Sequence, residues 1–145
     1  MKNQPQKKGT KANARNAGGF KLQDTFSRDV ISAYKKCAVT QTSVYQAMQA
    51  AHILECKNAT EKEIVKVMDV TNGILLRRDW HAAFDKQLWG INPKDFSIVL
   101  GEKMKTNDEY SEYDGKKVKL PSKKELQPNT AALELRYKQF LDANK

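Results

Sequence analysis

The sequence is poor in cysteine and in long apolar runs, and both absences restrict the kinds of protein it encodes. The cysteines are Cys37 and Cys56, and neither belongs to a Cys-x-x-Cys pair, which argues against a disulfide scaffold or a cysteine-rich zinc ribbon. No apolar run approaches membrane-spanning length, and no apolar segment follows the charged N-terminus as it would in a secretory signal. We therefore expect an intracellular, cytoplasmic protein that does not enter a membrane.

Acidic residues are scarce relative to basic ones. The 145 residues include 26 Lys and Arg but 17 Asp and Glu, which gives a formal net charge of +9. Such a balance favours a polyanionic partner, with nucleic acid ahead of an acidic membrane surface. Because only 39% of the residues are hydrophobic and 30% are charged, part of the chain is expected to lie outside the core.

The N-terminal stretch is basic and has almost nothing to bury. Residues 1–19 contain five basic residues and no acidic residue. We predict a disordered basic arm over residues 1–21, followed by one domain over residues 22–145. The candidate nucleic-acid contacts in the arm are Lys7, Lys8, Lys11 and Arg15. A solubilising tail explains the same composition equally well.

Hydrophobic spacing predicts a mixture of helices and short strands. Helices are expected over residues 24–34 and 130–143, the latter burying Leu133, Tyr137, Phe140 and Leu141. The capping-box residues Thr60 and Glu63 predict a further short helix up to Met68. Extended segments are expected at 47–54, 74–76 and 118–120, with a hairpin around the turn at 92–95 and a loop over 105–117.

One further helix, expected from Asp79 to about Leu88, carries two adjacent stripes. Trp80, Phe84 and Leu88 recur every four residues and should form the buried stripe. His81 and Asp85 are also four residues apart, on the neighbouring stripe. Both side chains can therefore converge on one point beside the core face.

The chain has two histidines, so their placement is informative. His52 ends the extended segment AMQAAHIL, whereas His81 begins a helix. Asn72 lies 20 residues after His52 and nine before His81, and Asp85 follows four residues later. Hydrolysis of a phosphodiester needs a base, a cation that offsets developing charge, and a fixed alignment of both with the phosphate.

These residues resemble the core of a known family. AAHILE, followed by NGILLRRDWHAAFD, is similar to the His–Asn–His core of HNH endonucleases, in the subfamily with the motif AHI…NGxxL…HxxFD. FSRDVISAYKKCAVTQ and the closing KLP…P…L…F are similar to the flanks of that subfamily, so the likeness covers roughly residues 22–142. The resemblance implies an α+β fold: a ββα-metal (HNH, His-Me finger) nuclease core flanked by N- and C-terminal helices.

The resemblance also implies a role for each motif residue. His52 would be the general base, and Asn72 would tie the loop that presents it. His81 and Asp85 would bind one divalent cation, with Mg²⁺ first and Mn²⁺ or another transition metal as alternatives. Taken singly, these residues have simpler explanations, such as a turn or a surface helix pair, so the hypothesis depends on their joint spacing.

Two neighbouring features complete the comparison with the family. Arg77 and Arg78 are candidate nucleic-acid contacts, because a guanidinium can grip a phosphate with two hydrogen bonds. Many HNH enzymes carry a His or Asp immediately before the base as another metal ligand, whereas this chain has Ala51 there. Magnesium often keeps several waters, so two protein ligands are feasible.

The function that follows is a divalent-metal-dependent endonuclease acting on DNA phosphodiester bonds, with double-stranded DNA as the substrate and 5′-phosphate and 3′-hydroxyl ends as products. A homodimer would supply one site for each strand. Two alternatives stay open: a non-catalytic nucleic-acid-binding module that retains the HNH finger, and a protein-interaction or toxin-like subunit whose arm binds a partner. Cleavage of DNA would separate the nuclease from the non-catalytic binding module, and a co-purifying protein would indicate the interaction subunit.

Overall fold

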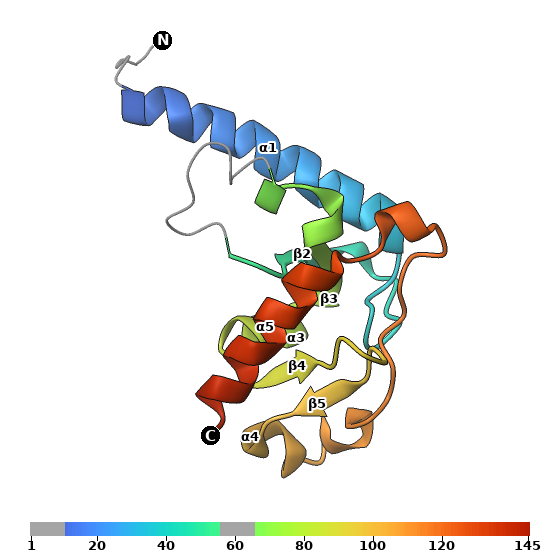
Figure 1. Ribbon diagram of the computed structural model, residues 1–145. Helices are drawn as coiled ribbons and strands as arrows, with labels where there is room; N and C mark the ends of the chain where they lie inside the picture. Colours follow the sequence, from blue (N-terminus) through green and yellow to red (C-terminus); the bar gives the residue numbers. More distant parts are fainter. Residues whose placement is uncertain (1–10, 56–65) are drawn as a thin grey trace.

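The computed structural model describes residues 11–55 and 66–145, which form helices and two small antiparallel sheets (Figure 1). In chain order the helices and strands are α1 (Lys11–Tyr34), β2 (Met48–His52), β3 (Gly73–Arg77), α3 (Arg78–Asp85), β4 (Trp89–Ile91), β5 (Ile98–Leu100), α4 (Glu102–Lys105) and α5 (Thr130–Ala143). This mixture confirms the α+β class. None of the described helices is both long and apolar enough to cross a membrane.

The centre of the fold is a hairpin that leads straight into a helix. Strands β2 and β3 pair antiparallel, with Met48 opposite Arg77 and His52 opposite Gly73, and α3 begins at the next residue, Arg78. The strand–strand–helix unit expected of an HNH core is therefore present. It carries His52 on its first strand and both predicted metal ligands on its helix.

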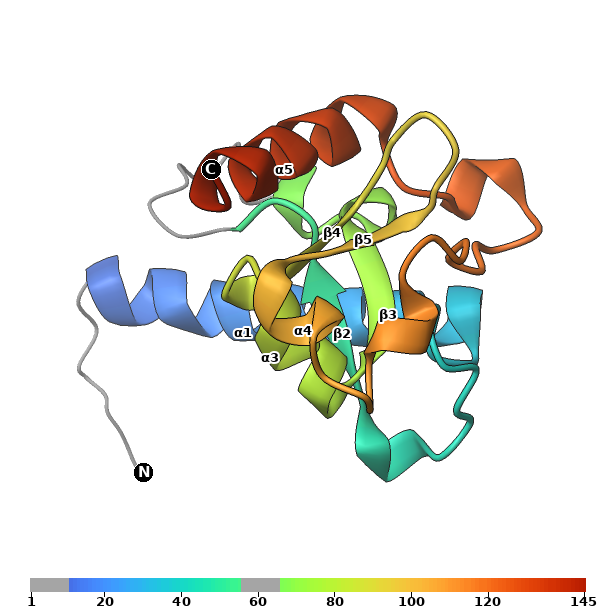
Figure 2. The same cartoon turned by 90° about the horizontal axis from the view of Figure 1, so that it is seen from below.

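The hairpin is buried on both faces because side chains alternate along a strand. On one face, Met48 and Leu75 pack with Phe26 and Val30 of α1. On the opposite face, residues of both strands pack with α3 in a second hydrophobic cluster, which includes Ala51, Ile74, Leu76, Trp80 and Phe84. Figures 1 and 2 show α1 running across β2 and β3, so this long helix covers one face of the site-bearing unit.

The second sheet and the C-terminal helix close the other side of the core. Strands β4 and β5 pair antiparallel, and the Trp89 indole donates a hydrogen bond to the Trp80 carbonyl at 2.9 Å. Helix α5 lies on β4 (Figure 2), where the Phe140 ring rests against Gly90. The first and last described helices thus pack on different parts of the same core.

Several elements differ from the sequence-based expectation at their ends. Helix α1 begins at Lys11, so residues 11–21 are helical, whereas a disordered arm was expected there. Ala, Lys, Arg and Gln favour helix, and the packed C-terminal half of α1 stabilises its N-terminal half. The helix expected over 79–88 stops at Asp85, and Gln87 adopts a left-handed φ of 60°. Residues 1–10 and most of the helix expected from Thr60 to Met68 lie outside the described residues.

The prediction of a strand over 118–120 is wrong. Lys117 forms a single bridge with Ser97, and the next two backbone amides diverge, Val118 to the Phe96 carbonyl and Lys119 to the Ala38 carbonyl. This segment therefore joins two regions instead of pairing with one strand. The loop over 105–117 is confirmed apart from its first residue, which ends α4, and a short helical turn at 111–113.

The C-terminal helix spans the predicted residues, but its buried side chains differ from the prediction. Leu133 and Phe140 are buried as expected, and Tyr137 is half-buried. Leu141 is 46% exposed, whereas Arg136 is 2% exposed. The helix face that meets the core is rotated toward Arg136, which a hydrophobic pattern cannot reveal.

Gly73 is the position where α1 comes closest to the hairpin. A Cβ atom at this residue would lie 2.3 Å from Val30 Cγ2 and 2.9 Å from Phe26 Cζ. We predict that Gly73→Ala lowers the free energy of unfolding by about 1–3 kcal/mol, because the packed helix must shift. Urea denaturation measures this. Ala82→Ser, which adds one atom at an exposed position of α3, should change stability by less than about 0.5 kcal/mol. Equal effects of the two substitutions would contradict the packing described here.

Candidate active site

Asn72 closes the loop at the end of the hairpin. Its side-chain NH₂ donates to the carbonyls of Leu54 and Val67, both at 2.9 Å, and its Oδ1 accepts from the Leu54 amide at 3.0 Å. The residue is buried, so each of these bonds replaces one that water cannot make. The side chain therefore fixes the backbone two residues beyond His52.

His52 sits at the end of β2 on the face that meets α1. Its imidazole stacks on the Phe26 ring, with 4.1 Å between the ring centroids and 4° between their planes. Its Nε2 lies 3.4 Å from the Met68 sulfur. A thioether can only accept a hydrogen bond, so this contact assigns the ring hydrogen to Nε2 and leaves the lone pair on Nδ1.

His81 and Asp85 form a pair one turn apart on α3. His81 Nε2 lies 3.2 Å from Asp85 Oδ2, and the side chains are 22% and 47% exposed. The other ring nitrogen, Nδ1, lies 2.8 Å from Gln49 Oε1 on β2. Because an amide oxygen only accepts, Nδ1 carries a hydrogen, and Nε2 is the nitrogen available beside the carboxylate.

The histidine on the strand and the pair on the helix share one electrostatic environment. Burial lowers the pKa of His52 below its usual 6.5, the charge of His81 lowers it further, and the carboxylate of Asp85 raises it. The charges of His81 and Asp85 therefore act on the His52 imidazole in opposite directions. His52 nevertheless contacts Phe26 and Met68, whereas His81 contacts Gln49 and Asp85; the base and the pair approach from opposite faces of the hairpin.

Part of the chain is similar to a known protein family. Residues 37–92 match the family model described as HNH endonuclease. Over this segment, which is less than half of the chain, the protein is similar to HNH endonucleases. The segment contains His52, Asn72, His81 and Asp85, whereas all of α1 and all of α5 lie outside it. No curated protein matches the chain.

HNH nucleases act on DNA and generally use a divalent metal, so the His81–Asp85 pair of this segment is the candidate metal site. The pair fits a cation in its chemistry, since an imidazole nitrogen and a carboxylate oxygen converge and Gln49 orients the ring. Over residues 11–55 and 66–145, no group of three or more His, Cys, Asp or Glu side chains could hold a metal ion. The site thus fits a cation that keeps most of its waters, as Mg²⁺ does.

The Ala51 position cannot supply another ligand. Its side chain is fully buried in the cluster that contains Ile74 and Leu76, on the hairpin face opposite His52. A carboxylate there would have to be accommodated among apolar side chains. A cation at this site would therefore take its protein ligands from α3.

Arg77 is held by a carboxylate. Its Nε and Nη2 donate to the two oxygens of Asp79 at 2.8 and 2.9 Å, and the Tyr110 hydroxyl donates to the same carboxylate at 2.8 Å. The hydrogen bonds from Arg77 lower the pKa of Asp79 to about 2. A phosphate that used the same edge of the guanidinium would have to displace Asp79, so the geometry disfavours the phosphate contact predicted for Arg77.

Arg78 is better placed for a phosphate. It is exposed, its Nε donates to the Gln46 carbonyl at 3.0 Å, and its spacing to His81 and Asp85 puts all three on one side of α3. Of the predicted basic contacts in the arm, Lys7 and Lys8 lie outside the described residues, and Lys11 and Arg15 belong to α1.

Four residues of the site were not singled out from the sequence: Phe26, Gln49, Met68 and Arg136. Gln49 carried a signal, because it is a polar residue inside the predicted extended segment 47–54, between Ala47, Met48 and Ala50. Phe26 lies in the helix predicted over residues 24–34, but its stacking on an imidazole depends on a contact between distant segments. Met68 and Arg136 also act across long sequence separations, of 16 residues to His52 and 83 to Ile53.

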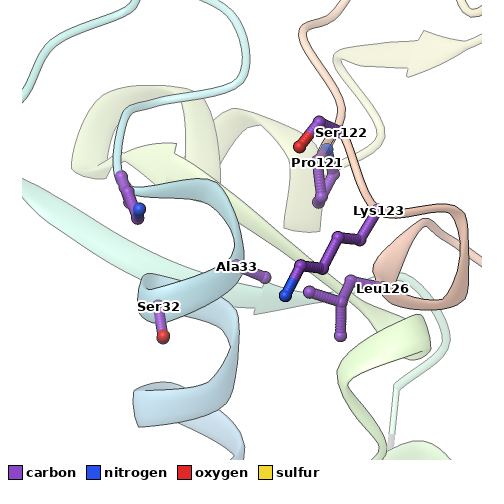
Figure 3. A pocket seen from close by; sticks show the side chains of 7 residues that line it. Ser32, Ala33, Pro121, Ser122, Lys123 and Leu126 are labelled. Atoms are coloured by element: carbon purple, nitrogen blue, oxygen red, sulfur yellow. The ribbon is translucent and has the colours of Figure 1, made fainter.

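A cavity elsewhere in the molecule is lined by no histidine and no carboxylate. It has a volume of about 240 Å³ and lies between the end of α1 and residues 121–126 (Figure 3). Its lining residues are Ser32, Ala33, Lys35, Pro121, Ser122, Lys123 and Leu126. With no histidine or carboxylate among them, this cavity is separate from the candidate active site.

The Asn72 side chain provides a direct test of how the site is held. We predict that Asn72→Ala lowers the free energy of unfolding by about 1–3 kcal/mol for each backbone group that it leaves unpaired. Thermal or urea unfolding measures the loss. The matched control is Asn129→Ala, which removes the single side-chain bond that caps α5 and should cost only about 1 kcal/mol. A smaller loss for Asn72→Ala than for the control would contradict its tying role.

Proposed function

We propose that this chain is a divalent-metal-dependent endonuclease that hydrolyses phosphodiester bonds of double-stranded DNA, leaving 5′-phosphate and 3′-hydroxyl ends. The observation that supports this most strongly is the strand–strand–helix unit, which carries His52 on β2 and the His81–Asp85 pair on α3 within the segment that matches the HNH endonuclease model. The net charge of +9 favours a polyanionic substrate. An α+β core with helices on both sides of the hairpin gives these side chains a rigid support.

In this proposal His52 is the general base. The Met68 contact leaves Nδ1 as the atom that accepts a proton from the attacking water. Stacking on Phe26 restricts rotation of the imidazole, and partial burial keeps the ring neutral near pH 7 because it lowers the pKa. Asn72 contributes indirectly, by fixing the backbone that carries the base.

His81 and Asp85 would hold the divalent cation, for which Mg²⁺ is our first choice, with Mn²⁺ or another transition metal as alternatives. When bound, the cation supplies charge stabilisation for the phosphate oxygens and the departing 3′ oxygen. Gln49 keeps the His81 ring oriented through Nδ1. Arg78, on the same side of α3, is placed to bind a neighbouring phosphate.

A second candidate function is favoured by one observation. The described residues offer the cation two protein ligands, and Ala51 is buried where many HNH enzymes have another. A non-catalytic nucleic-acid-binding module would keep the fold without needing a tightly held metal. It would bind DNA with strong salt dependence and cleave none with any divalent metal.

Plasmid cleavage tests the proposed reaction. We expect nicking of supercoiled DNA with Mg²⁺ or Mn²⁺ and none with EDTA. His52→Ala should lower the rate by about 10²- to 10⁴-fold, because the base is lost while DNA binding remains. Ser43→Ala, at an exposed position before β2, is the matched control and should cleave like the parent. Full activity of His52→Ala would show that His52 is not the base.

The pH dependence of cleavage follows from the lowered pKa of His52. The base must be neutral, so kcat/KM at saturating metal should rise with pH and level off above a midpoint below 6.5. Since burial is the largest cause of the lowered pKa, Phe26→Leu should move the midpoint up toward 6.5 by exposing the ring to water. A midpoint above 7, or no change in Phe26→Leu, would argue against this assignment of the base.

A further inference from the structure

Arg136 is a buried charge on α5, outside the matched residues 37–92. Its side chain donates from Nη1 to the Ile53 carbonyl at 3.3 Å and from Nη2 to the Phe84 carbonyl. The guanidinium also lies over the Phe84 ring, 4.0 Å from its centroid. Within the described part of the chain Arg136 forms no ion pair, and its Nε has no hydrogen-bond partner.

A buried arginine without a salt-bridge partner is costly to keep. A methionine of similar length would fill the same space without removing a charge from water. The contacts of Arg136 therefore matter more than the volume it fills. They are backbone carbonyls, which hold the charge through hydrogen bonds that no apolar residue could make.

Both carbonyls belong to residues next to the candidate active site. Ile53 directly follows His52, and Phe84 directly precedes Asp85. The Phe84 carbonyl lies in the last turn of α3, where a positive charge is favourable, and it also accepts from the Gln87 amide at 3.0 Å. Because the guanidinium is rigid and planar, the two donors set the separation of the two carbonyls.

The carboxylates near the active site also act on the Arg136 guanidinium. Burial lowers the pKa of Arg136, and the charges of Asp85 and Glu55 raise it.

We propose that Arg136 is a positioning residue of the active site, which holds the end of β2 and the last turn of α3 at the separation that His52 and Asp85 need. This inference rests on the proposed nuclease function for its kinetic consequence but not for its structural one. It makes α5, beyond the matched residues 37–92, a functional part of the site.

Two substitutions test the proposal kinetically. Arg136→Met removes both donors and the charge at similar length, and Arg136→Lys keeps the charge but loses the planar fork. We expect Arg136→Met to lower kcat about 10- to 100-fold with KM nearly unchanged, and Arg136→Lys to recover part of the loss. Lys138→Met, at an exposed position of α5, should have no effect on kcat. Leu133→Ala supplies a destabilised α5 variant without a change at the carbonyls.

A second measurement needs neither metal nor cleavage. The chain has two histidines, so NMR resolves the titration of His52 directly. Asp85→Asn should lower the pKa of His52, because the carboxylate raises it. In the Arg136→Met background this effect of Asp85→Asn should shrink, since the carboxylate moves away from the imidazole. Arg136→Lys should give an intermediate effect, and it serves as the test if Arg136→Met does not fold.

The outcomes separate the two proposals. An unchanged effect of Asp85→Asn in the Arg136 variants would overturn the positioning role, whatever the kinetics show. A loss of kcat in Arg136→Met no larger than in Leu133→Ala, compared at equal folded fraction, would overturn it as well. If the parent cleaves no DNA, the nuclease proposal fails, and the NMR result alone decides the role of Arg136.

Discussion

The hydrogen bonds of Asn72 are the constraint on which the site depends. One buried amide joins the backbone just beyond β2 to the backbone just before β3, using both of its donor hydrogens and its oxygen. These bonds hold the end of the hairpin, where a strand would otherwise fray, so His52 is carried at a defined place. Phe26 on one side and the pairing of His52 with Gly73 on the other complete the support.

Burial divides the chemistry between the two histidines. His52 is stacked and partly removed from water, so its neutral form is favoured, as a base near pH 7 requires. His81 has its Nδ1 on Gln49 and its Nε2 beside an exposed carboxylate, so an imidazole nitrogen and a carboxylate oxygen lie together at the surface. Different surroundings thus suit two copies of one side chain to different tasks. In the proposed nuclease, these tasks are proton transfer and cation binding.

Much of the site could be predicted from the sequence because it is local. The spacing of His81 and Asp85 on one helix stripe, the strand ending in His52 and the turn before β3 are all short-range patterns, and the described fold contains each of them. The matched HNH segment confirms the resemblance over residues 37–92.

The parts that the sequence did not predict depend on long-range contacts. Arg136 is buried on the helix face where hydrophobic spacing placed Leu141. The sequence could not predict this, because an arginine is expected at the surface and its two carbonyl partners come close only in the folded chain. Residues 11–21 look like a tail in composition, yet they extend a helix that Phe26 and Val30 anchor farther along. Similarly, no pattern indicates that Asp79 occupies the Arg77 guanidinium.

A crystal structure of the chain grown with Mn²⁺ tests the central claim most directly. The account predicts one anomalous peak in contact with His81 Nε2 and the Asp85 carboxylate, with the His52 imidazole facing it across the width of a phosphate. A metal bound elsewhere, or a His52 ring turned away from the pair, would contradict it.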